Sequence, residues 1–140
     1  MRIGSMLEQH ARTNQLGEVF AAETGFLLST DPDTVRAPDA AFVSVANFKG
    51  LEEVSGFLSV APDLVIEVVL PNDSSSAVEE KANSWIQFGV RLVLVVDPAN
   101  QSIRTYRDQA LINVYFAGAH VDAADVVREW RFAVSDVFII

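Results

Sequence analysis

Apolar residues recur along this chain with two different periods, and each period indicates a different kind of element. Near the N-terminus, Ile3, Leu7 and Ala11 keep the spacing of one helix face, which predicts a helix over residues 2–14. Residues 62–71 read PDLVIEVVLP, a nearly continuous β-branched run with a proline at each end. Such a run is typical of a central strand that is buried on both faces.

Two strands are predicted between the helix and this central strand. Residues 17–29 read as a strand interrupted or bulged at Gly25, and residues 36–45 as a second strand that pairs with it in a hairpin. Residues 46–61 mix glycine, serine and acidic residues without a period. We expect a surface loop there, with one helical turn, that could form a flap.

The segments after the central strand continue an α/β pattern. A helix over residues 77–89 starts behind three capping residues and ends at Gly89, and strands are predicted over 91–97 and 102–107. Strand, helix and buried strand in this order predict a βαβ unit. The tail offers a short strand over 111–116 and a final apolar segment. We therefore predict an α/β fold with a mixed central sheet flanked by helices, and a single domain over residues 1–140.

Composition narrows the class of protein. Half of the 140 residues are hydrophobic, which suffices for one core. Cysteine is absent, which excludes disulfides, thiolate metal sites and cysteine nucleophiles and favours a cytoplasmic setting. The N-terminus lacks a signal-peptide core, and no apolar run reaches the length of a membrane span, so we expect a soluble protein. No nucleotide-binding or α/β-hydrolase motif appears.

Net charge argues against a broad nucleic-acid surface. The formal charge is −9, and Lys49 and Lys81 are the only lysines. Phosphate binding normally draws on clustered Lys and Arg. A divalent cation held by carboxylates can nevertheless supply local positive charge.

Glu67 stands in the middle of the predicted central strand, where a carboxylate must be paired, protonated or bound to a cation. Alternation places it on one face of that strand with Asp63 and Val65. One interpretation is an ion pair with an arginine. The candidates for this partner are Arg91, Arg104 and Arg107.

Asp39 and Lys81 extend this cluster of candidates. Taken singly, Asp39 after Pro38 reads as a turn aspartate and Lys81 as a solvated helical lysine. Together with Glu67, however, they form a set suited to phosphodiester chemistry. Two carboxylates from neighbouring strands can hold Mg²⁺ or Mn²⁺, and an ammonium group can orient water or stabilise phosphate charge.

Five ordered segments resemble the Uma family of "putative restriction endonucleases", a branch of the PD-(D/E)XK superfamily. The segments are GEVFAAETGF (17–26), RAPDAAFVS (36–44), PDLVIEVVLPND (62–73), EEKANSWIQFGVRLVLVVDP (79–98) and WRFAVSDVF (130–138). The resemblance implies a PD-(D/E)XK restriction-endonuclease-like core and metal-dependent hydrolysis of DNA. It implies that Asp39 and Glu67 bind Mg²⁺ or Mn²⁺. Lys81 occupies the place of the catalytic lysine on the helix, while the commoner position for that lysine holds Val69.

The chain departs from the family pattern in three places. Leu70 replaces a serine before the proline, and Trp85 replaces a tyrosine, which we expect to preserve packing and lose a hydroxyl. We expect the usual N-terminal segment with a further acidic residue to be missing, because the chain starts inside the helix that follows it. Glu18 and Glu23 are candidates for that carboxylate, although strand residues of this kind usually face solvent.

These departures leave alternatives open. The chain could be a catalytically silent, truncated member that serves as a binding or assembly module. It could also be an acidic domain in which Asp39, Glu67 and Lys81 form only a salt-bridged network, so that Lys81→Ala chiefly lowers stability. An exposed sheet edge left by a missing segment would favour a homodimer.

Overall fold

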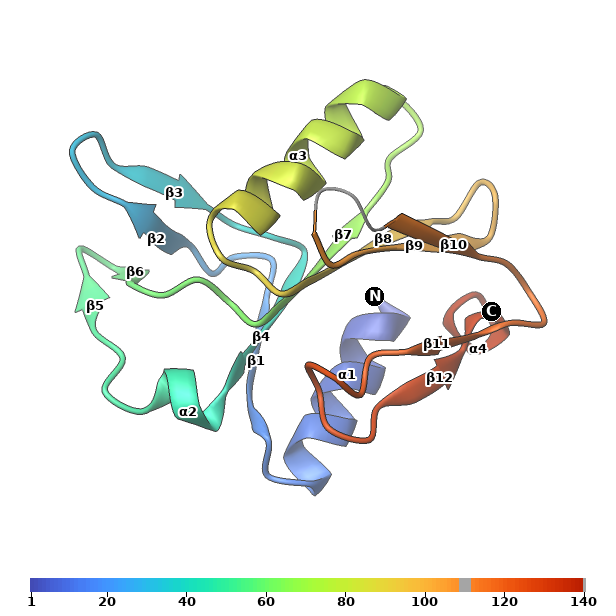
Figure 1. The fold of residues 1–140 in the computed structure, drawn as a ribbon, viewed down its shortest axis with the longest axis horizontal. Helices are drawn as coiled ribbons and strands as arrows, with labels where there is room; N and C mark the ends of the chain where they lie inside the picture. The colour runs from blue at the N-terminus through green and yellow to red at the C-terminus, as the bar shows by residue number, and fades with distance from the viewer. Residues whose placement is uncertain (109–111, 140) are drawn as a thin grey trace.

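A six-stranded mixed sheet runs through the molecule (Figure 1). The computed structural model describes residues 1–108 and 112–139. In spatial order the strands are β1 (Gly17–Ala21), β4 (Ala40–Ser44), β7 (Leu64–Val68), β8 (Leu92–Asp97), β9 (Ser102–Tyr106) and β10 (Ile112–Tyr115). β7 and β8 are parallel, and the other neighbouring pairs are antiparallel.

The predicted βαβ unit is present as β7, α3 (Ser75–Gln87) and β8. Ser74 caps α3, since its side-chain oxygen accepts a hydrogen bond from the backbone N–H of Ala77. Gly89 follows the helix with a φ of 103°, a left-handed conformation that favours glycine. The capping residues thus fix both ends of the helix that follows the central strand.

Helices cover the two faces of the sheet separately (Figure 1). The helix α1 (Arg2–Thr13) buries Ile3, Leu7 and Ala11 against one face, as its periodicity predicts. The helix α3 buries Ala82 and Trp85 against the other face. The C-terminal elements join the core on the α1 side. They are β11 (His120–Asp122), β12 (Arg131–Ala133) and α4 (Val134–Val137).

The predicted two-stranded hairpin over residues 17–45 is wrong in detail, because the first predicted strand splits in two and a separate short strand forms just before the second. β1 and β4 pair in the large sheet, whereas β2 (Phe26–Ser29) and β3 (Thr34–Arg36) pair in a second, four-stranded sheet. A side chain at Gly25 would lie 2.7 Å from the Phe57 ring, so glycine permits the close contact where the chain changes sheets.

The segment predicted as a loop also contains short regular elements. These are α2 (Val45–Phe48), β5 (Glu53–Val54) and β6 (Phe57–Leu58). β5 and β6 form a hairpin, and β6 joins β2 through the pairing of Phe26 with Leu58. The helical turn is confirmed. Two-residue strands fall below the length at which a periodic pattern can be recognised.

The tail agrees with its predicted strand and turn. β10 occupies most of the predicted segment 111–116, of which residue 111 lies outside the described residues. Gly118 has a φ of 92° in the turn that follows. Among the described helices, none combines the length and apolar character needed to cross a bilayer.

Candidate active site

Strand pairing brings Asp39 and Glu67 together. Ala40 at the start of β4 pairs with Ile66 of β7 in an antiparallel arrangement. Asp39, which precedes Ala40, therefore lies beside Glu67, which follows Ile66. The Asp39 N–H donates to Glu67 Oε1 at 3.4 Å. In return, Asp39 Oδ2 accepts a 2.7 Å hydrogen bond from the Val68 N–H. The backbone of each strand thus orients the carboxylate of the other.

The α3 helix supplies two further groups to the same carboxylate. Lys81 Nζ lies 3.4 Å from Glu67 Oε2, and Trp85 Nε1 donates a 2.8 Å hydrogen bond to that oxygen. Lys81 and Trp85 are four residues apart and so share one helix face. The Glu67 side chain is 8% exposed and that of Lys81 is 56% exposed. A shielded carboxylate therefore meets an ammonium group that solvent can reach.

The pKa of the Glu67 carboxyl is raised above its ordinary value. Burial is the largest cause, because it disfavours the charged form, and the nearby charge of Asp39 acts in the same direction. The Trp85 hydrogen bond, the charge of Lys81 and the Asp39 N–H all oppose this shift. The balance leaves a carboxylate that gains from binding a proton or a cation.

The expectation of an arginine partner for Glu67 is wrong. Arg91 binds Asp63 at 3.0 Å, and Arg107 binds Asp125 at 2.9 Å. Asp63 also accepts a hydrogen bond from the backbone N–H of Ser44, at 2.7 Å. The basic partner of Glu67 is Lys81, which lies on α3, the helix that follows β7 in the chain.

Trp85 has a role beyond the packing expected from the sequence. It is 2% exposed and donates its indole N–H to Glu67. The helical spacing of Lys81 and Trp85 is the signal that could have revealed this contact. Leu70, which follows β7, is 61% exposed to solvent.

The donor set at Asp39 and Glu67 fits a hard divalent cation. Among the described residues, Asp39 Oδ1 accepts no hydrogen bond, and Glu67 Oε1 receives only the long bond from Asp39 N–H. No group of three or more His, Cys, Asp or Glu side chains with metal-site geometry occurs in the described part. Mg²⁺ is commonly held by one or two carboxylates, with water and substrate phosphates completing its shell. The two carboxylates match that pattern.

Glu8, which the sequence did not single out, is another acidic group beside Asp39. Glu8 of α1 and Asp39 line one cavity of about 350 Å³. Glu8 also forms a salt bridge with Arg12. Glu18 and Glu23 are both exposed, as the solvent-facing interpretation predicted.

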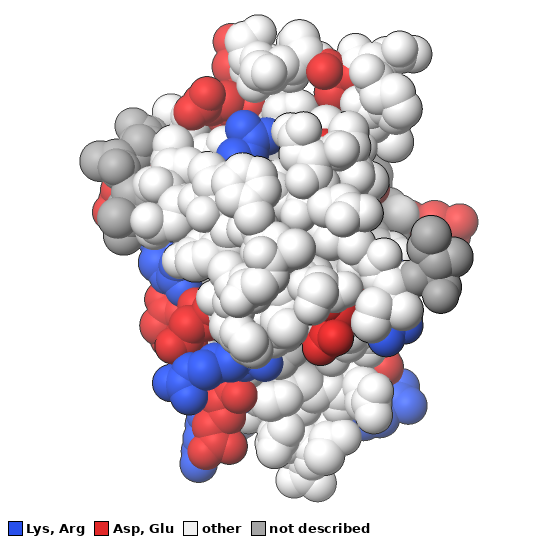
Figure 2. Space-filling view, turned by 90° about the vertical axis from the view of Figure 1, so that its right-hand side faces the viewer, with Lys and Arg blue, Asp and Glu red and all other residues white. Residues whose placement is uncertain are grey.

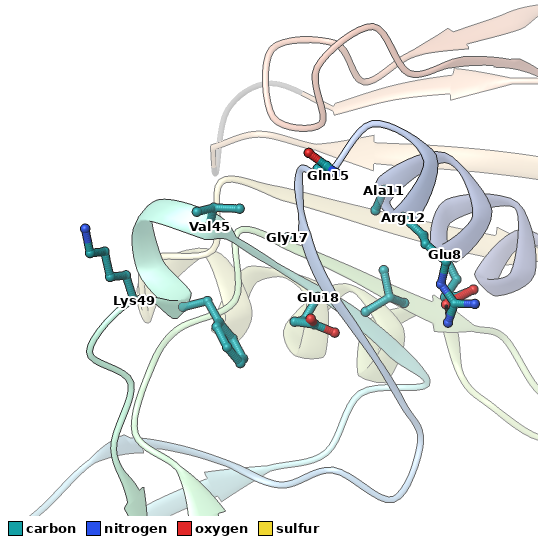
Figure 3. Close-up of a pocket in the computed structure, with 10 residues that line it drawn as sticks. Glu8, Ala11, Arg12, Gln15, Gly17, Glu18, Val45 and Lys49 are labelled. Carbon is teal, nitrogen blue, oxygen red and sulfur yellow. Dashed lines mark ion pairs between the residues drawn. The ribbon is translucent and has the colours of Figure 1, made fainter.

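A separate cavity of about 510 Å³ lies between α1, β1 and α2. Figure 3 shows Glu8 and Arg12 of α1 on one side, Val45 of α2 and the following Lys49 on the other, and Glu18 of β1 between them. Its lining mixes both signs of charge and includes none of Asp39, Glu67 and Lys81. The candidate site is therefore defined by its chemistry and not by the depth of a pocket.

A comparison with protein-family models identifies the family of this chain. The model of the Uma2 family, described as "Putative restriction endonuclease", matches residues 1–135. The chain belongs to the Uma2 family. The resemblance carried by the five sequence segments is thereby confirmed, and the family description supports nuclease activity.

A solved structure shows the same fold. It is the crystal structure of a putative nuclease belonging to DUF820 from Anabaena variabilis, with a TM-score of 0.79 and 20% sequence identity. The match covers 97% of this Uma2 chain and 75% of that chain. At this identity the likeness shows the fold alone, and it confirms the predicted α/β fold with a mixed central sheet flanked by helices. No curated protein matches the sequence.

Proposed function

We propose that this Uma2 protein is a divalent-metal-dependent endonuclease that hydrolyses DNA, with Asp39, Glu67 and Lys81 as its catalytic residues. The observation that carries the proposal is that the Asp39 N–H, just before β4, and the Lys81 ammonium of α3 both contact the Glu67 carboxylate of β7. The family description supports a nuclease, and DNA is the substrate that the description implies.

Each residue has a separate part in the proposed reaction. Asp39 and Glu67 would hold Mg²⁺ or Mn²⁺, which supplies Lewis acidity and positive charge at a phosphate. Lys81 is exposed enough to reach a water molecule or a phosphate oxygen, where its ammonium stabilises developing negative charge. Trp85 fixes the Glu67 carboxylate through one oxygen and leaves the other directed at Asp39.

Cleavage of DNA tests the proposal directly. Wild-type protein is incubated with supercoiled plasmid and with single-stranded DNA in Mn²⁺, Mg²⁺ or EDTA. We expect nicking that requires the metal and disappears in Asp39→Asn and Glu67→Gln. Calorimetric titration with Mn²⁺ should show binding to wild type and none to either variant. Folded wild-type protein that neither binds Mn²⁺ nor cleaves DNA contradicts the proposal.

The end of the sheet supports a second candidate function, assembly through a homodimer. β10 is an edge strand of the described sheet, and its Ile112, Val114 and the following Phe116 are 37%, 48% and 56% exposed. Figure 2 shows the face with this end of the sheet, whose centre is largely uncharged. An apolar unpaired edge can pair with a second copy about a twofold axis.

Light scattering after size exclusion tests this assembly. We expect a dimer for wild type, a monomer for Val114→Lys, and a dimer for the control Val45→Lys, which charges an exposed apolar residue on α2. A monomeric wild type at all concentrations contradicts it. A dimer without metal-dependent cleavage would favour a catalytically silent assembly module.

We also infer that residues 1–140 form one domain, because both apolar clusters pack on the same six-stranded sheet. The absence of cysteine supports a cytoplasmic location.

A further inference from the structure

Half of the basic residues of this acidic protein are paired with carboxylates in the described part of the chain. Five of the ten Lys and Arg side chains form salt bridges in the described structure, namely Arg12, Lys81, Arg91, Arg107 and Arg131. With a net charge of −9, the molecule as a whole repels a nucleic-acid backbone. A DNA strand must therefore be held by the few cations that remain available near the site.

Arg36 is such a cation. It lies at the end of β3, it is exposed, and among the described residues its side chain has no hydrogen bond or salt bridge. Arg36 lines a cavity of about 410 Å³ together with Lys81 and Trp85 of α3, the two residues that contact Glu67. Figure 1 shows the β3 strand running beside α3. Two cations from different elements thus face one space at the candidate site.

We propose that Arg36 binds a backbone phosphate of the DNA strand within two nucleotides of the scissile phosphate, in the cavity that it shares with Lys81. The inference rests on the proposed nuclease function and names a substrate contact for it. A guanidinium group presents a planar fork of donors that matches two phosphate oxygens.

Chain length limits which phosphate Arg36 can reach. Arg36 and Asp39 are three steps apart along the chain, and an extended chain of three steps spans at most about 10–11 Å. Pro38 stiffens the connection, because its ring fixes one backbone torsion. Arg36 therefore contacts a phosphate within two nucleotides of the one that Asp39 and Glu67 engage.

Glu80 lines the same cavity and repels a phosphate there. Substitution of Glu80 is therefore a control that should change DNA affinity in the opposite direction to substitution of Arg36. Arg36→Ala should weaken DNA binding, whereas Glu80→Gln should strengthen it. A general change in the stability of α3 or β3 would not produce opposite effects on binding.

Binding of a fluorescent duplex, measured by anisotropy in Ca²⁺, tests the contact without cleavage. We expect Arg36→Ala to weaken binding about tenfold, because a charge-assisted hydrogen bond is lost. The slope of log K against log salt concentration should fall by about 0.9, as for the loss of one phosphate contact. Arg36→Lys should recover part of the affinity. The matched control is Arg128→Ala, an exposed arginine outside this cavity, and it should bind like wild type.

Neutral methylphosphonates then locate the phosphate. One is placed at each position within two nucleotides on either side of the cleavage point. At the contacted position it should weaken wild type and leave Arg36→Ala unchanged. In cleavage assays, Arg36→Ala should raise KM and leave kcat within about twofold.

The outcomes distinguish a failure of the Arg36 contact from a failure of the proposed nuclease function. Unchanged binding and KM in Arg36→Ala, beside an active wild type, overturn the Arg36 contact alone. Equal losses in Arg36→Ala and Arg128→Ala also overturn it. A wild type that binds DNA through Arg36 and never cleaves it supports the contact and contradicts the nuclease function.

Discussion

At the scale of single residues, Glu67 serves the proposed function but lowers the stability of the folded protein. It is the buried carboxylate of the central strand, and its pKa is raised chiefly by burial. The folded chain therefore holds a proton on this group more tightly than the unfolded chain does. Stability is lost as the pH rises from the ordinary value of 4.5 through the higher value of the folded state.

Replacing Glu67 with glutamine should stabilise the protein while abolishing its activity. The amide keeps the shape and an acceptor for Trp85, and it removes the buried charge. We expect the free energy of unfolding of Glu67→Gln to exceed that of wild type by about 1 kcal/mol at pH 8. The difference should vanish near pH 4. Thermal unfolding across this range measures it, with the exposed Glu18→Gln as control. A variant less stable than wild type at pH 8 contradicts the interpretation.

The sequence predicted Asp39, Glu67 and Lys81 because each belongs to a segment of the family pattern with fixed order and spacing. It did not predict Trp85 as a donor to Glu67, nor Glu8 and Arg36 as neighbours of the site. These contacts join α1, β3 and α3 across the fold. They depend on how elements pack, which local periodicity does not encode.

At the scale of elements, α3 decides where Lys81 and Trp85 lie. Its first turn begins beside the end of β7, and Ser74 fixes that start through its hydrogen bond with the Ala77 N–H, at 3.1 Å. The capping residues were visible in the sequence. The helix itself begins at Ser75, two residues before the predicted start at residue 77.

Ser74→Ala should loosen this helix. Loss of an N-cap costs about 1 kcal/mol, so we expect a fall of that size in the free energy of unfolding. Chemical denaturation measures it. Ser75→Ala, one residue further on, is the matched control and should cost clearly less. Equal losses in the two variants would argue that Ser74 has no capping role.

The strands at the N-terminal side were harder to predict. The 17–29 segment is apolar over most of its length, and a single-strand interpretation satisfied its pattern. In the structure β1 pairs with β4 and β2 with β3, so one chain segment serves two sheets. The choice of partner is made by contacts between distant residues, such as the Gly25 and Phe57 contact.

At the scale of the whole molecule, Arg107, which follows β9, connects the sheet to the C-terminal segment through hydrogen bonds. Its Nε and Nη2 both bind the Asp125 carboxylate at 2.9 Å, and Nη2 also donates to the Asp122 carbonyl at 2.6 Å. The hydrogen bond from Arg107 is the largest cause that lowers the pKa of Asp125. The stabilisation from this pair is therefore present above the ordinary pKa near 3.8 and is lost as the pH falls below it.

Arg107→Gln should lower the free energy of unfolding at pH 7 by about 1 kcal/mol or less, since Asp125 is 54% exposed and solvent screens the pair. The gap between variant and wild type should narrow as the pH falls below 4. Melting curves at pH 7 and pH 3.5 measure this, with the exposed Arg128→Gln as control. A difference in stability that grows as the pH falls would contradict a stabilising Arg107–Asp125 pair.

The central claim is that Lys81 acts on the substrate and does not serve merely as a structural partner of Glu67. The most direct measurement is the single-turnover nicking rate in Mn²⁺ for wild type, Lys81→Ala and Lys49→Ala, together with their free energies of unfolding. Lys49 is the other lysine of the chain and is exposed on a different element. We expect Lys81→Ala to lose at least about 100-fold in rate, with stability within about 1 kcal/mol of wild type, and Lys49→Ala to match wild type. A Lys81→Ala variant that still nicks DNA at the wild-type rate but unfolds much more readily would show that the three residues form a structural network instead.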